Sequence, residues 1–143
     1  MELRFVQSAF PGFDKTLHVR QRASVFTEIK NVRQERGPGR RRWFESDGFD
    51  LVVWLDGVGA LTGFQICYNF GRGEHALTWR PGVGFAHNAV DTGSAGPFSN
   101  LTPILVADAV VPWPEVIAQF AARSASLEPE LREFVQVRLD AKK

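Results

Sequence analysis

At 143 residues the chain has the length of one ordinary domain, and 44% hydrophobic with 23% charged residues excludes a disordered chain. Its 17 basic and 16 acidic residues leave a formal charge of +1, a field too weak to favour binding to nucleic acids or anionic membranes. A single cysteine excludes an internal disulfide, and the sequence shows neither a signal peptide nor an apolar run of the ~20 residues that span a bilayer. We therefore expect one cytoplasmic domain over residues 1–143.

The N-terminal part of the chain predicts short elements. Alternating apolar and polar residues over 2–7 favour a strand, and the FPGF stretch at 10–13 favours a turn. Residues 16–32 fit two structures, because their apolar positions match one face of a helix while the run SVFTEI suits a strand nearly as well. We favour a helix over residues 22–33.

Residues 36–42 read RGPGRRR, a Gly/Pro turn followed by an arginine run. Guanidinium groups match phosphate oxygens, so a phosphate-binding patch is one interpretation. The other is a solvated loop that enters an edge strand, where positive charge discourages pairing between edges. The balanced charge of the whole chain favours the solvated loop, and nucleic acid is not the partner that we expect.

Residues 41–91 alternate short apolar–polar runs with glycine-bearing turns, which is typical of an antiparallel meander. Asp47-Gly48 favours a type I′ turn, because both residues tolerate positive φ. Further turns are expected at 57–60, at 71–74 and around Pro81-Gly82. Together these turns predict the cross-strand pairs Trp43–Val52, Phe44–Leu51, Leu51–Ile66, Val53–Phe64, Leu55–Thr62, Ile66–Trp79, Tyr68–Leu77, Trp79–Phe85 and Leu77–His87.

Side chains alternate between the two faces of such a sheet, so this register assigns every residue to a face. One face is apolar and must be covered. It comprises Phe44, Leu51, Val53, Leu55, Phe64, Ile66, Tyr68, Leu77, Trp79 and Phe85. The second face mixes polar groups with two tryptophans, and is a ligand groove, a partner surface, an ordinary solvent face or a face covered by the N-terminal segment. It comprises Arg41, Trp43, Glu45, Asp50, Val52, Trp54, Gln65, Cys67, Thr78, Arg80 and Asn88.

The C-terminal part predicts the covering layer. Residues 101–111 favour a further strand, with Pro103 confined to an edge, and residues 114–124 have the period of an amphipathic helix. A second helix is expected after Ser126, a favourable N-cap. The predicted fold is α+β, an antiparallel meander of five to six strands with the C-terminal helices packed on one face; a barrel-like closure is the alternative.

The common catalytic motifs are absent, since the chain has no Walker loop, G-x-S-x-G, C-x-x-C or H-E-x-x-H. On the predicted register His75, His87 and Asp91 share a face and gather at one end of their strands. Such a set would bind a divalent metal ion or perform acid–base chemistry. A histidine facing the core is also commonly one that is hydrogen-bonded to a buried partner. No other cofactor is expected.

Glu45 and Asp50 would lie opposite each other as like charges, which is unfavourable unless Arg41, Arg80 or a ligand neutralises them. This carboxylate pair therefore joins His87 and Asp91 as a catalytic candidate.

The stretch RRWFESDGFDLVVWLDGVGALTGFQICYNF, with ALTW and LTPILV downstream, resembles small bacterial proteins of no assigned function. The resemblance implies a bacterial, cytoplasmic setting and provides no catalytic residue to transfer.

From the missing motifs and the second face we predict a small binding or protein-interaction module that self-associates as a homodimer. Its ligand or partner face would comprise Trp43, Trp54, Gln65 and Arg80, with both indoles partly exposed in the monomer. A small-molecule ligand also fits this face. The alternative is a small enzyme or metal-binding protein that uses His75, His87 and Asp91.

Overall fold

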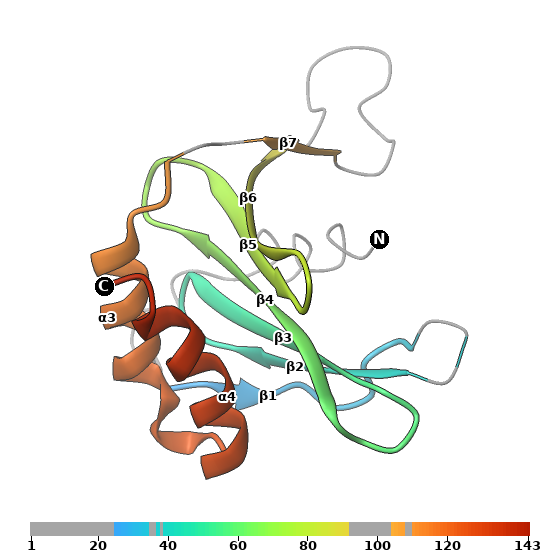
Figure 1. Ribbon diagram of the computed structural model, residues 1–143. Helices are drawn as coiled ribbons and strands as arrows, with labels where there is room; N and C mark the ends of the chain where they lie inside the picture. Colours follow the sequence, from blue (N-terminus) through green and yellow to red (C-terminus); the bar gives the residue numbers. More distant parts are fainter. Residues whose placement is uncertain (1–24, 35–36, 38, 92–103, 108–109) are drawn as a thin grey trace.

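The computed structural model describes residues 25–34, 37, 39–91, 104–107 and 110–143. Within these ranges an antiparallel sheet of seven strands packs against two helices, which confirms the predicted α+β class (Figure 1). The strands neighbour one another in chain order: β1 Thr27–Glu28, β2 Arg40–Glu45, β3 Phe49–Leu55, β4 Leu61–Asn69, β5 Glu74–Arg80, β6 Gly84–Asp91 and β7 Ile104–Ala107. The helices are α3 Trp113–Arg123 and α4 Pro129–Asp140, joined by the short 3₁₀ helix η1 Ser124–Ser126.

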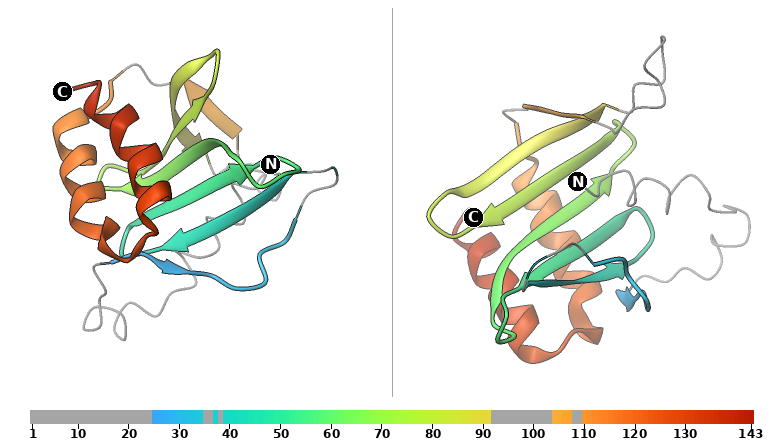
Figure 2. Two further views of the ribbon diagram at one scale, coloured as in Figure 1. Left: turned by 60° about the horizontal axis from the view of Figure 1, so that its bottom comes forward. Right: turned by 90° about the vertical axis from the view of Figure 1, so that its right-hand side faces the viewer.

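The sheet is strongly curled, and α3 and α4 lie side by side on one of its faces (Figures 1 and 2). We call this the helix-side face and the other the opposite face. Strands β1 and β7 are the two ends of the strand order, so the sheet is open in the part of the chain that the structure describes. The predictions for residues 2–7, for residues 10–13 and for Pro103 lie outside the described residues.

The helix-side face carries the main hydrophobic core. Every residue predicted for it is there, with Leu55, Trp79 and Phe85 at its partly buried margin. Burying a Leu, Val or Phe side chain contributes about 1.5–3 kcal/mol, so this layer supplies most of the driving force for folding. The buried members are Phe26, Phe44, Phe49, Leu51, Val53, Phe64, Ile66, Tyr68, Leu77, Val116, Ile117, Phe120, Leu127, Leu131, Val135 and Leu139.

The pairing of β2 with β3 is the predicted one, with Trp43 opposite Val52. The predicted turn type is wrong, however, because a type I′ turn needs positive φ at both central residues, and of the two only Gly48 has it, at 69°. Arg123 at the end of α3 secures this turn by donating a hydrogen bond of 3.0 Å to the Asp47 carbonyl.

The pairing of β4 with β5 is displaced by two residues from the prediction, so that Tyr68 lies opposite His75 and Ile66 opposite Leu77. The turn begins earlier than expected because the Asn69 side chain accepts a hydrogen bond of 2.8 Å from the Gly71 backbone N–H. A shift of two residues leaves every side chain on its predicted face.

Of the two remaining strand pairings, one differs from the prediction at its end and the other agrees with it. Between β3 and β4 a bulge sets Leu55 opposite Leu61 in place of Thr62. Between β5 and β6 the predicted pair of Trp79 with Phe85 is confirmed.

The helix predicted over residues 22–33 is wrong for its described part. Thr27 and Glu28 form β1, which pairs with β2. Asn31 has a φ of 59°, a left-handed conformation that a helix cannot contain. Beyond it, the Gln34 side chain follows the β2 backbone, accepting from the Arg41 N–H at 2.9 Å and donating to the Arg41 carbonyl at 3.1 Å. Residues 27–34 therefore line the edge of the sheet.

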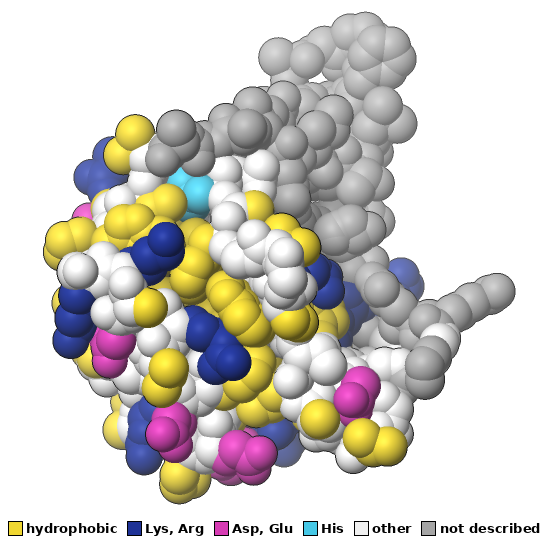
Figure 3. Space-filling model, in the orientation of Figure 1, with side chains coloured by type: hydrophobic (Ala, Val, Ile, Leu, Met, Phe, Trp, Pro, Cys, Tyr) yellow, Lys and Arg dark blue, Asp and Glu magenta, His cyan; other side chains and the backbone are white. Residues whose placement is uncertain are grey.

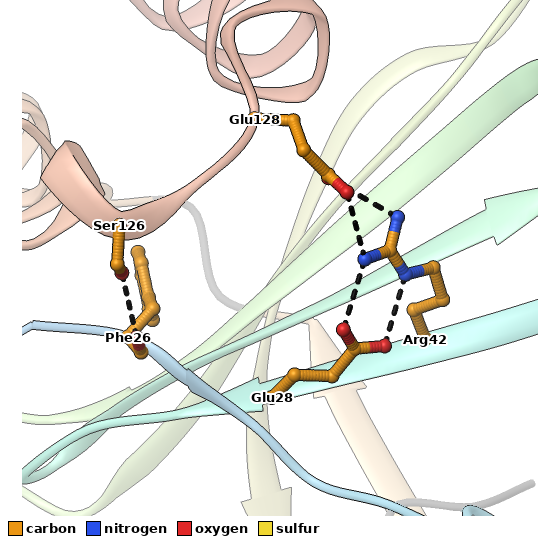
Figure 4. Close-up of polar contacts among 5 residues, drawn as sticks. All are labelled: Phe26, Glu28, Arg42, Ser126 and Glu128. Carbon is orange, nitrogen blue, oxygen red and sulfur yellow. Dashed lines mark hydrogen bonds and ion pairs between the residues drawn. The ribbon is translucent and has the colours of Figure 1, made fainter.

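Side-chain contacts fasten this edge to the helical layer (Figure 4). The Arg42 guanidinium bridges Glu28 at 2.9 Å and Glu128 at 3.2 Å. Ser126 was the predicted N-cap of the second helix, and this is wrong, because its hydroxyl donates instead to the Phe26 carbonyl at 2.6 Å and α4 begins after Glu128. Serine is a preferred N-cap residue, but Ser126 instead joins the edge of the sheet to the helical layer.

Candidate functional site

The opposite face is buried around a second, smaller apolar cluster. Trp43, Val52, Cys67 and Ala76 form it, and Ile29 and Val32 from the edge segment pack against it. Trp43 is only 2% exposed and Gln65 only 8%. The expectation of two partly exposed indoles is therefore wrong for Trp43, which is a core residue, whereas Trp54 is half-buried.

Asp50 is the buried carboxyl of the opposite face, 1% exposed. Its oxygens accept hydrogen bonds from Trp43 Nε1 at 3.0 Å and from the Ser46 N–H at 3.3 Å. Burial raises the pKa of Asp50 to about 8, an increase that these two bonds oppose and the nearby charges of Glu45 and Glu74 reinforce. The like charge of Glu45 predicted to oppose Asp50 is thus one of the smaller causes of this raised pKa.

Cys67 lies beside Asp50 on the next strand, as its cross-strand partner. Its thiol is 3.5 Å from Gln65 Oε1, and the Gln65 amide donates to Thr78 Oγ1 at 2.9 Å. Burial, followed by the charges of Asp50 and Glu74, raises the pKa of the Cys67 thiol well above its ordinary value. Because the thiolate is the reactive form, this cysteine is an inert core residue.

Where the opposite face reaches one end of the sheet it opens into a pocket of about 360 Å³, which we call the Arg–Trp pocket. Three of the residues predicted for the second face, Arg41, Trp54 and Arg80, line it, and Arg40 adds a further cation. Its principal lining residues are Arg40, Arg41, Trp54, Asp56, Thr62 and Arg80.

Arg80 stacks on Trp54 in this pocket, with its guanidinium carbon 4.2 Å from the ring centroid. Gly63, the cross-strand partner of Trp54, makes room for both side chains. A Cβ at this position would lie 2.9 Å from the Trp79 carbonyl oxygen and 3.4 Å from the Trp54 ring. Glycine is therefore required where the indole crosses β4.

The lining charges of the Arg–Trp pocket are unbalanced. Among the described lining residues, three arginines face one carboxylate, and Asp56 Oδ1 is engaged by the turn N–H groups of Val58 at 3.0 Å and Ala60 at 2.9 Å. These bonds hold the pKa of Asp56 below its ordinary value, so the carboxylate stays charged at the rim. A surplus of guanidinium groups next to an indole face is suited to a planar or compact anion.

A second pocket of about 320 Å³ lies at the other end of β4 and β5, on the helix-side face. We call it the Tyr–His pocket. Aromatic rings form most of its wall, and Arg72 from the β4–β5 turn brings a positive charge. Val110 and Pro112, which precede α3, also line it. Its lining residues are Tyr68, Phe70, Arg72, His75, His87, Val110 and Pro112.

The rings of this pocket are closely associated. The Tyr68 hydroxyl lies 2.5 Å from His87 Nε2, and both side chains are buried. His75 and His87 have ring centroids 5.2 Å apart and planes within 6° of parallel. His75 Nδ1 lies 3.0 Å from the Gly73 carbonyl, which can only accept, so this nitrogen carries the proton.

The structure thus brings His75 and His87 together, as predicted. Asp91 is the last residue of β6, where its backbone pairs with Ile104, and its side chain lies outside the described part. No group of three or more His, Cys, Asp or Glu side chains that could hold a metal ion occurs among the described residues. The sequence missed Tyr68, because the two-residue error in the β4–β5 register separated it from His75.

A third feature is the aromatic margin of the core, covered by cations. Arg138 stacks on Trp79 and Phe134, 4.4 and 4.1 Å from their centroids, and Lys142 approaches Phe85 at 5.9 Å and Trp113 at 5.5 Å. Hydrophobic side chains interleaved with Lys and Arg are visible across this side of the molecule (Figure 3). Long cationic side chains here shield the edge of the core from water.

In the described part of the chain, none of the helices has the length and apolar character needed to traverse a bilayer. Comparisons of the chain with protein-family models, with curated proteins and with solved structures gave no match.

Proposed function

We propose that the protein is a non-enzymatic binding module whose Arg–Trp pocket holds a small ligand bearing a compact oxyanion, such as a phosphate or sulfate group. The observation that carries this proposal is the convergence of Arg40, Arg41 and Arg80 on one pocket beside a half-buried indole. A guanidinium fork pairs with two oxygens of such a group at once.

The surroundings favour binding over catalysis. Asp56, the one carboxylate among the described residues that line the pocket, is bonded to turn N–H groups, and its pKa is lowered, which is the wrong direction for a general base or acid near neutral pH. Arg41 is held in place by hydrogen bonds from its guanidinium to the Arg33 carbonyl, including one of 3.0 Å from Nε. A guanidinium held in place by a backbone carbonyl can pair with an anion.

Calorimetric titration with inorganic phosphate, accompanied by tryptophan fluorescence, tests the proposal. We expect saturable binding with a Kd of about 1 mM or tighter, and a fluorescence change that Trp54→Phe abolishes. Arg80→Gln should weaken binding about tenfold or more, because a charge-assisted hydrogen bond contributes about 1.5–3 kcal/mol.

Arg132→Gln on α4 is the matched control, since it removes one guanidinium from the same chain outside the pocket. Equal losses in Arg80→Gln and Arg132→Gln would mean that phosphate responds only to net charge, which contradicts the proposal. Binding that needs a polynucleotide and falls steeply with salt would also contradict it, because that behaviour indicates counterion release from a nucleic acid.

The homodimer predicted from the sequence is a second part of the proposal. Val58 and Val83 are 89% and 75% exposed at the tips of the β3–β4 and β5–β6 turns, and both turns lie at the end of the sheet that carries the Arg–Trp pocket. These two side chains offer apolar contacts to a second copy of the chain. Light scattering should give twice the monomer mass, and Val83→Lys should return the monomer; a monomeric wild-type protein would rule the dimer out.

A further inference from the structure

The Tyr–His pocket is a separate site from the one just proposed. Thr62 near the start of β4 lines the Arg–Trp pocket and Tyr68 near its end lines this one, so the strand separates them by most of its length. Trp54 and Arg80 belong to the opposite face, whereas Tyr68 packs in the helix-side core. The two pockets therefore share no lining residue, and a ligand of one cannot reach the other.

The walls of the Tyr–His pocket fit a flat, unsaturated ligand. Tyr68 lies 5.6 Å from His75 and 5.9 Å from His87, with planes within 19° and 13° of parallel. Phe70 is closer still to Tyr68, at 4.5 Å between centroids. Rings that share one orientation present their faces and edges in common directions, so an added aromatic ring can join the group by offset stacking.

The polar groups of the pocket favour an acid over an amine. Among the described residues that line the pocket, Arg72 is the one cation and none is a carboxylate. Arg72 is ion-paired with Glu115 at 3.2 Å, but both side chains are largely exposed, so a ligand carboxylate can share or replace this partner at little cost. The Tyr68 hydroxyl and the His87 ring lie further in, already bonded to each other.

We propose that the Tyr–His pocket binds a small aromatic carboxylic acid, with its ring among Tyr68, Phe70 and His75 and its carboxylate paired with Arg72. The volume of about 320 Å³ lies at the lower end of the range of ligand pockets and suits a single-ring acid. The mostly apolar wall with a few convergent polar groups is the usual composition of such a site.

The test is an NMR titration that follows the ring resonances of His75 and His87, with benzoate as the probe. We expect a saturable shift of both resonances by benzoate. Benzyl alcohol, which keeps the ring and lacks the charge, and cyclohexanecarboxylate, which keeps the charge and lacks the aromatic ring, should each bind about tenfold more weakly or worse.

Arg72→Gln should weaken benzoate about tenfold and is expected to fold, because Arg72 is an exposed turn residue. Arg132→Gln, a cation removed elsewhere, should leave the titration unchanged. The proposal is overturned by the absence of a saturable shift with benzoate, by equal binding of cyclohexanecarboxylate, or by wild-type affinity in Arg72→Gln. None of these outcomes bears on phosphate binding at the Arg–Trp pocket.

Discussion

The two faces of the sheet are both buried, yet they are buried in different ways. The helix-side face is filled with hydrocarbon and aromatic side chains from the sheet, α3 and α4. The opposite face has a small apolar cluster in which Asp50, Arg41 and Gln65 are also buried. A buried polar group is costly unless its hydrogen bonds are made. The stability of the opposite face therefore depends on specific hydrogen-bond partners, whereas that of the helix-side face depends on how completely its side chains fill the available volume.

The difference explains where the pockets lie. Each pocket is at an end of the sheet: the Arg–Trp pocket continues the polar face and the Tyr–His pocket continues the aromatic one. The chemistry of each pocket thus follows from the face that leads to it.

The largest expected effect tests the volume dependence of the helix-side face. Phe64 is fully buried and contacts the rings of Trp79, Phe85 and Phe134. Phe64→Ala should lower the free energy of unfolding by about 3–5 kcal/mol, because it removes the packing of a whole ring and leaves a cavity. Chemical denaturation measures this loss. The control Val137→Ala, at an exposed position of α4, should change the free energy by no more than about 0.5 kcal/mol.

The next effect tests the polar burial of the opposite face through pH. The pKa of Asp50 rises from 3.8 to about 8 on folding, so between these values the folded protein holds a proton that the unfolded chain releases. Stability should therefore be greatest at the acidic end and fall, on the order of a few kcal/mol, as pH rises through this window. Glu74, whose pKa burial also raises, adds to the fall with the same sign.

The variant Asp50→Asn separates the contribution of Asp50 to this pH dependence from that of Glu74. The amide does not titrate, so most of the slope should disappear, even if the variant is less stable overall because its NH₂ group meets a donor, Trp43 Nε1 or the Ser46 N–H. Thermal unfolding followed at a series of pH values measures the slope. An unchanged slope in Asp50→Asn would show that this carboxyl is ionised in the folded protein and that the two faces differ less than we infer.

The smallest effect concerns the contact that ties the edge strand to the helical layer. Glu128→Gln removes one of the two carboxylates around Arg42, and Glu28 remains at 2.9 Å. Because Glu128 is largely exposed, the loss should be about 0–1 kcal/mol. Glu133→Gln, at an exposed position of α4 beyond its first turn, is the matched control for denaturation. A loss above about 2 kcal/mol would mean that the edge is held by charge more than by Phe26, which the core buries.

The faces of the meander could be predicted from sequence because they depend only on alternation. The β4–β5 error of two residues moved Tyr68 from His75 to Leu77 without changing its face. Cross-strand partners are harder to predict than faces, because they also depend on where each turn begins. The Asn69 side chain decided that point through one hydrogen bond, and sequence pattern does not reveal such a bond in advance.

The candidate sites were predicted less completely for the same reason. His75 with His87, and Trp54 with Arg80, follow from face and strand end alone, and the structure brings each pair together. Trp43 was expected to be partly exposed, but residues 29–32 cover it. The apolar spacing of these residues fits a helix. In the structure Asn31 has a left-handed conformation, which redirects the chain over Trp43. The metal-binding alternative stays a prediction, as does cytoplasmic location.

Cys67 gives the opposite face a built-in reporter. It is the only cysteine of the 143 residues, it lies at the middle of that face, and it is 3% exposed. An alkylating reagent can reach it only while the cover is lifted, and the thiol then recovers its ordinary acidity. The labelling rate under native conditions therefore measures how often the face opens, by local opening or by global unfolding. Gln34 lines the Arg–Trp pocket, and the segment that leads to it packs against the cluster that contains Cys67. A ligand that binds in the pocket and stabilises this segment should slow the labelling of Cys67, so the labelling rate would report how much of the pocket is occupied.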